Sequence, residues 1–174
     1  MRLPELIELS RADFVTIDTI GPPGQRTFYL QAAQDDMLVT LIIEKEQAAA
    51  MSVAISSMLE ELREARGELE PISLELVHPV EPLFRVGRLG LGYDETRDML
   101  VVTAEELAAE EKQHKAQVHI WASRAQMAAL ARKAAIAVTS GRPICPLCGE
   151  TIDPGEQHVC VRGNGRKRTD ATDR

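Results

Sequence analysis

The sequence predicts an α+β fold: an antiparallel sheet built as two βββα-like halves, two helices that cover it, and a small cysteine-rich module at the C-terminal end. Two triplets of short β-type runs, each followed by a run of helical periodicity, predict the two halves. All three cysteines lie near the C-terminal end and mark off the module. A chain of 174 residues, 44% of them hydrophobic, is long enough for one such body and a small appendage.

The first half is predicted to contain three strands and one helix. β-Branched and alternating residues form the strands, and turn residues such as Gly21 separate them. Apolar residues at Met51, Ile55 and Leu62 then follow helical spacing, and Gly67 ends the pattern. The expected strands span residues 14–20, 27–32 and 37–43, the helix spans residues 47–66, and an irregular, proline-containing connection spans residues 68–82.

The second half repeats this order. Leu89, Leu91 and Tyr93 share one face of a strand, and Ser123 is placed to cap the second helix. The repeated order fits an internal duplication, and equally fits convergent use of the same helix-start residues. The expected strands span residues 84–93, 99–103 and 118–121, a charged solvated helix or loop spans residues 104–117, and the second helix spans residues 124–140.

The cysteines lie within sixteen positions of one another and share this segment with a histidine. Cys145 and Cys148 are separated by two residues, so both sulfurs can face one cation, and Gly149 gives the backbone the freedom that such a turn needs. His158 and Cys160 project from the same side of an extended segment. Three thiolates and one imidazole match the closed tetrahedral set of a structural zinc ion, whose binding energy would replace a missing apolar core.

Two other interpretations of the cluster stay open at this point. A thioredoxin-like redox pair is expected between a strand and a helix, whereas Cys145 follows a helix end. A catalytic zinc would keep one position open for water. In that case His158 would be unbound, or the fourth ligand would be one of the distant histidines His78, His114 and His119.

The ends of the chain suggest a cytoplasmic protein without a membrane anchor. Pro4 and Glu5 interrupt any apolar stretch that could act as a signal peptide, and no run approaches the roughly 18–20 apolar residues of a spanning helix. An odd number of cysteines does not form a secreted disulfide framework. The predicted organisation is a body at residues 1–140, a zinc-binding module at residues 141–165 and a disordered basic and polar tail at residues 166–174.

Five stretches carry a resemblance to known sequences: Gly24-Gln-Arg-Thr-Phe-Tyr-Leu-Gln31, Phe84-Arg-Val-Gly-Arg-Leu89, Gly141-Arg-Pro-Ile-Cys-Pro-Leu-Cys-Gly149, His158-Val-Cys160 and Arg162-Gly-Asn-Gly165. Together they resemble a bacterial family known only as a domain of unknown function. The resemblance implies the domain boundaries and the metal ligands, and it implies no reaction. Val161 stands where the family usually has proline, a departure that leaves the ligands untouched.

Three arginines are candidate anion-binding residues. Arg26 follows a glycine- and proline-rich turn, and Arg85 and Arg88 flank Gly87. Guanidinium groups bind carboxylates and phosphates, so these arginines could line a cleft of an enzyme or of a small-anion-binding protein. The alternative is that these residues have only a structural role. Arg26 would then belong to a hairpin connection, and Arg85 and Arg88 to a strand that glycines make more flexible.

The charge distribution indicates which class of partner the protein can bind. A net charge of −7 argues against general nucleic-acid binding, because phosphate contacts need a clustered positive surface. Four positive charges at residues 162–168 leave weak nucleic-acid binding through the zinc module and tail as an alternative. No acid, base or nucleophile constellation accompanies the ligand set. The sequence therefore favours a non-catalytic, zinc-stapled interaction or scaffold protein with a protein partner.

Overall fold

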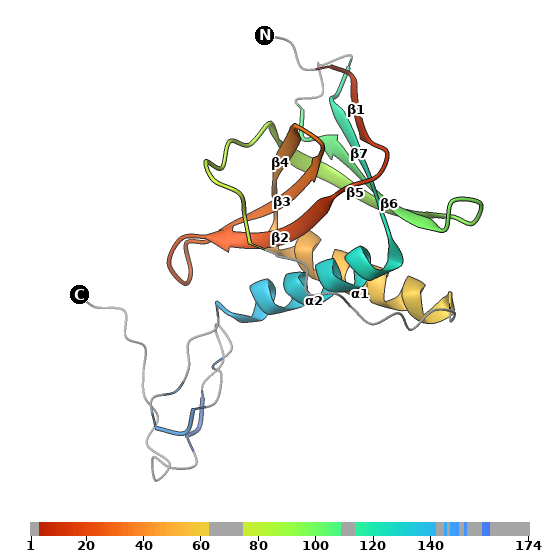
Figure 1. Cartoon of the computed structure of the whole chain (residues 1–174). Coiled ribbons are helices and arrows are strands. Elements are labelled where there is room, and N and C mark those ends of the chain that lie inside the picture. The colour runs from red at the N-terminus through yellow and green to blue at the C-terminus, as the bar shows by residue number, and fades with distance from the viewer. Residues whose placement is uncertain are drawn as a thin grey trace.

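The computed structural model describes residues 4–62, 75–108, 114–141, 145, 147–149, 152 and 158–160. In these ranges seven strands form one sheet in the order β1-β7-β6-β5-β4-β3-β2, accompanied by two helices, so the predicted α+β class is confirmed (Figure 1). The elements are β1 Leu6–Leu9, β2 Phe14–Ile20, β3 Thr27–Gln34, β4 Met37–Ile43, α1 Lys45–Glu61, β5 Phe84–Asp94, β6 Met99–Glu106, β7 Gln117–Ala122 and α2 Arg124–Thr139.

The two βββα-like halves are present in the order that the sequence predicts. Strands β2, β3 and β4 form one antiparallel meander before α1, and β5, β6 and β7 form another before α2. The meanders join where β4 runs parallel to β5, with Leu41 opposite Phe84 and Ile42 opposite Arg85. α1 lies between these two strands in the chain, and this crossover allows β5 to run in the same direction as β4. Whether the halves arose by duplication stays a prediction.

The sheet is mixed rather than purely antiparallel, which corrects the predicted strand directions. Besides the β4–β5 pair, β1 pairs parallel with β7, and Leu9 lies opposite Ile120. β1 was not predicted because its four residues, LIEL, are too few to show a strand pattern, and two of its apolar residues are adjacent rather than alternating. β6 also continues to Glu106, into the stretch expected to be a solvated helix or loop, because Ala104 faces the core.

Some predicted boundaries fall beyond the described ranges. α1 begins at Lys45, two residues before the expected start, and its expected end at residues 63–66 lies outside the described residues. The same holds for the predicted helix stop at Gly67, for residues 68–74 of the connection, for residues 109–113, and for residues 161–174, which include the predicted disordered tail. In the described ranges, neither helix has the length and apolar character needed to cross a bilayer.

The helices lie side by side against the strands (Figure 1). α2 packs against α1 and also against β2, and Ser52 Oγ donates a 2.7 Å hydrogen bond to the Ala131 carbonyl oxygen between the helices. The core is aliphatic, as expected from a chain with 3% aromatic residues. Its largest fully buried apolar side chains are Leu9, Ile17, Leu30, Leu41, Ile55, Leu100, Ile120, Met127, Leu130, Val15 and Val39.

The first turn of α2 is fixed by two sets of polar contacts. The predicted cap is confirmed, since Ser123 Oγ accepts from the Gln126 amide at 3.2 Å. Arg124 donates from Nε to Asp98 Oδ1 at 2.6 Å, from Nη2 to the Tyr93 hydroxyl oxygen at 2.9 Å and from Nη1 to the Leu62 carbonyl oxygen at 3.1 Å. Hydrogen bonds from Tyr93 and then Arg124 hold the pKa of Asp98 below its usual value. Arg124 thus joins the end of α1 to the β5–β6 turn.

A buried polar contact holds Val77 of the connection against the first meander. Gln31 in β3 is fully buried, although alternation places it on the face opposite Leu30. Its Nε2 donates to Thr40 Oγ1 at 3.0 Å and to the Val77 carbonyl oxygen at 3.1 Å, while Oε1 accepts from the Val77 amide at 2.7 Å. The side chain therefore takes the place of a backbone partner for Val77.

We expect Gln31→Ala to lower the free energy of unfolding by about 1–3 kcal/mol, because the Val77 and Thr40 groups lose their partner inside the protein. Urea unfolding of the full chain measures this change. Gln25→Ala is the matched control, since Gln25 is an exposed glutamine of the preceding turn. Equal changes in the two variants would contradict a role for the buried contact.

Candidate metal centre

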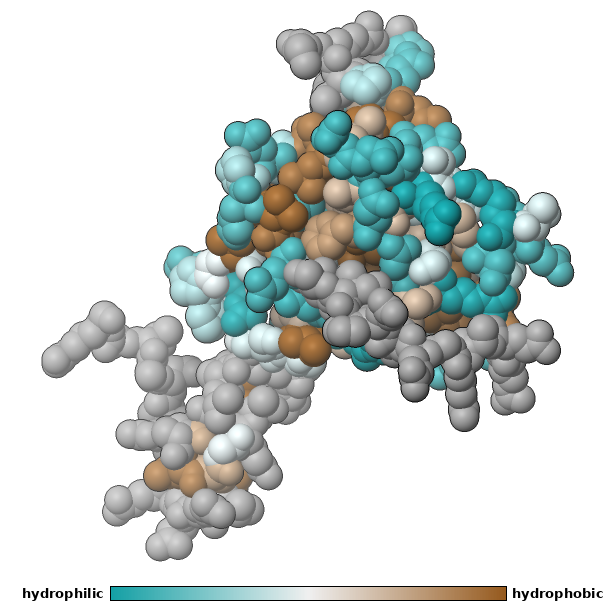
Figure 2. Space-filling model, viewed as in Figure 1, coloured by the Kyte–Doolittle hydropathy of each residue, from teal (hydrophilic) through white to brown (hydrophobic). Residues whose placement is uncertain are grey.

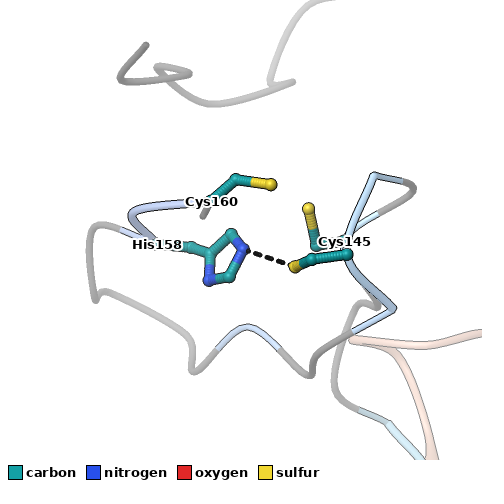
Figure 3. Close-up of side chains that lie close together, drawn as sticks. Cys145, His158 and Cys160 are labelled. Atoms are coloured by element: carbon teal, nitrogen blue, oxygen red, sulfur yellow. Dashed lines mark hydrogen bonds between the residues drawn. The ribbon is translucent and has the colours of Figure 1, made fainter. Parts of the chain in front are cut away.

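Four side chains converge near the C-terminal end (Figure 3). The ligand atoms of Cys145, Cys148, His158 and Cys160 all lie within 4.8 Å of one another. Cys148 Sγ and His158 Nε2, which lie on the two different segments, are 3.2 Å apart. Cys145 and Cys160 are buried, and the other two are half-buried. The four residues selected from the sequence by spacing therefore form one compact donor group.

A tight turn brings the first two cysteines together. The Gly149 amide donates to the Cys145 carbonyl oxygen at 2.8 Å, which closes the turn around Cys148. Gly149 has φ +76°, a left-handed conformation that side chains rarely adopt, while a Cβ added there would meet no atom within 4 Å. The requirement for glycine is thus conformational rather than steric, which agrees with the backbone freedom expected at this position.

Backbone amides favour the ionised form of Cys145. The amides of Cys148 and then Leu147 hydrogen-bond its sulfur and lower the pKa of the thiol to about 6, whereas burial opposes this change. The Cys148 and Cys160 side chains act in the same direction. None of the three cysteines forms a disulfide. A thiolate already stabilised by the turn is the form of cysteine that binds a metal.

The donor set fits a zinc ion. Zinc prefers thiolate sulfur and imidazole nitrogen in a tetrahedral arrangement, with Zn–S bonds of about 2.3 Å, which place two sulfurs about 3.8 Å apart. The observed upper limit of 4.8 Å is close to that separation, so small side-chain rotations suffice to close the set. The four residues would hold the ion, and its chemistry there would be to crosslink two chain segments. A redox pair would need only Cys145 and Cys148, and it leaves the convergence of the other two donors unexplained.

The remaining histidines contribute nothing to this group in the described ranges. His114 Nδ1 lies 3.5 Å from Glu5 Oε1, and His119 belongs to β7, opposite Thr103 and Glu8. A catalytic zinc that recruits a distant histidine therefore finds no support among these residues.

The structure brings together two of the three candidate arginines. Arg26 and Arg85 both line a cleft of about 450 Å³, and Arg88 is not among its lining residues. Arg26 Nη2 donates to the Ser140 carbonyl oxygen at 3.0 Å, and Arg85 forms an ion pair with Glu44. Arg88 is exposed on β5. The contact of Arg26 with the end of α2 was not predicted, because no local pattern reports a partner 114 positions away.

A mixed sheet, two helices and a C-terminal Cys3His cluster define an α+β protein with a candidate metal centre. The family described as a protein of unknown function, DUF3090, matches residues 7–160. The chain belongs to this family, and the resemblance stated from the sequence is confirmed. No curated protein and no solved structure matches the chain.

We expect His158→Ala to weaken zinc binding by more than about a hundredfold, because loss of outer partners of a metal ligand alone costs about 10–100-fold. Competition with a chromogenic chelator measures the affinity, and anomalous scattering at the zinc edge identifies the ion. His114→Ala is the matched control, since His114 lies outside the donor group. A wild-type chain without zinc, or equal losses in both variants, would contradict the assignment.

Proposed function

We propose that the protein is a non-catalytic, cytoplasmic interaction protein whose C-terminal module is stapled by a structural zinc ion. The observation that carries this proposal is the Cys3His group, whose four donor atoms lie within 4.8 Å. Four protein ligands complete a tetrahedral zinc, so no coordination position is left for water or substrate. A reducing compartment keeps the three thiols available to the metal.

The surface of the module supports a role in docking another protein. Leu147 lies between Cys145 and Cys148 and is 52% exposed, and Val159 lies between His158 and Cys160 and is 63% exposed. Figure 2 shows hydrophobic atoms at the surface of the module, at the lower left. Each of these residues lies in the chain between two metal ligands, so the ion would fix the backbone that presents it. Such preorganisation reduces the entropy lost on binding a protein partner.

The test compares partner capture by matched variants of the full chain. We expect chemical crosslinking to join the wild-type module to a specific set of proteins, and Leu147→Ser with Val159→Ser to reduce that capture at least about tenfold, the effect of losing two buried apolar contacts at an interface. Val53→Ser with Leu107→Ser is the control, because these residues of the body are at least comparably exposed, at 68% and 60%.

Zinc content is measured in both double variants, since neither pair includes a ligand. Identical capture by wild type, module variant and control variant would remove the docking role while leaving the metal centre intact. A salt-sensitive gel shift of nucleic acid by the wild-type chain would instead favour nucleic-acid binding.

A further inference from the structure

A second candidate site lies in the body, apart from the metal ligands. The cleft of about 450 Å³ is formed by the start of β3, the end of β4 with the start of α1, the start of β5, and the end of α2. Its size falls in the range of small-molecule sites, about 300–1,000 Å³. Four chain segments that are distant in sequence build it, so it exists only in the folded body.

Charged groups of both signs line this cleft. Arg26, Lys45 and Arg85 supply three positive charges, and Glu44 and Glu46 supply two negative charges, which leaves a formal charge of +1. A monoanion matches this balance. A phosphate dianion would be repelled by two carboxylates and would exceed the available positive charge.

The two guanidinium groups keep donors that the described part of the chain does not use. Arg26 donates from Nη2 to Ser140, and its Nε is buried without a hydrogen-bond partner in the described ranges. Arg85 donates a hydrogen bond from Nη1 to the Glu44 carboxylate. Each guanidinium has five N–H donors in a fork that suits a planar carboxylate.

The rest of the lining is apolar. Ile42 and Val138 are half-buried in the cleft wall, and Phe28, Ile43 and Ala137 lie buried behind them. An apolar ligand body would cover Ile42 and Val138 and remove them from water. The cleft thus offers cationic donors beside an aliphatic wall.

We infer that this cleft binds a small monocarboxylate with an apolar body. The carboxylate lies against the guanidinium groups of Arg26 and Arg85, and the body lies along Ile42 and Val138. This assignment goes beyond the docking role of the metal module and does not depend on it. Arg88, which the sequence placed with the other two arginines, takes no part.

Titration of the ¹⁵N-labelled full chain with octanoate, followed by amide NMR shifts, tests the assignment. We expect saturable shifts at Lys45, Glu46 and Arg85. Arg85→Gln should raise the dissociation constant at least about tenfold, as expected for loss of a charge-assisted hydrogen bond. Arg88→Gln is the matched control, an arginine of the same strand outside the cleft, and should leave the constant unchanged.

Two further arms separate charge from apolar contact. Lys45→Gln removes a cleft cation that forms no ion pair with the described residues, and it should weaken octanoate binding as well. Octylamine, with the same body and the opposite charge, should not shift these amides. The assignment is overturned if octanoate produces no saturable shifts, if octylamine or inorganic phosphate binds equally well, or if Arg88→Gln weakens binding as much as Arg85→Gln.

Discussion

The packing of α2 across α1 and β2 is the contact on which the arrangement of the body depends. β2 lies at one edge of the sheet and α2 follows β7 near the other edge, so this helix brings the two meanders around a shared core. Both ends of the helix are held by arginines. Arg124 ties the first turn to the β5–β6 turn, and Arg26 donates to Ser140 at the last turn, which contains no basic residue of its own. A cation at that end also complements the helix dipole.

The body and the module are stabilised by different physics. The hydrophobic core includes residues of every strand and both helices and ends at Ala137, whereas the buried residues beyond it are the ligands Cys145 and Cys160. Within the described ranges the buried side chains of the module are therefore cysteines rather than aliphatic residues. The four donor atoms that converge there are compatible with a bound ion, whose binding energy would take over what burial supplies elsewhere.

The features that could be predicted from the sequence are those that depend on residues close together in the chain. Strand alternation, helical spacing and the Ser123 cap depend on neighbours within a few residues, and so does the spacing of the Cys and His ligands. The missed features depend on distant segments. β1 is defined by its pairing with β7, and Gln31 is buried because Val77 crosses over it. Arg85 and Arg88 look alike in sequence, and only the fold places one of them in the cleft.

The distance in sequence between β2 and α2 also affects how the chain folds during synthesis. More than a hundred residues separate Ile17, which is buried in the finished core, from Leu130 on the last helix. The first meander and α1 leave the ribosome well before the helix that closes over β2. Until then this strand exposes apolar residues, and such waiting intermediates are the species that chaperones recognise and that aggregate at high concentration. The final helix of the body thus completes folding as well as linking the body to the metal module.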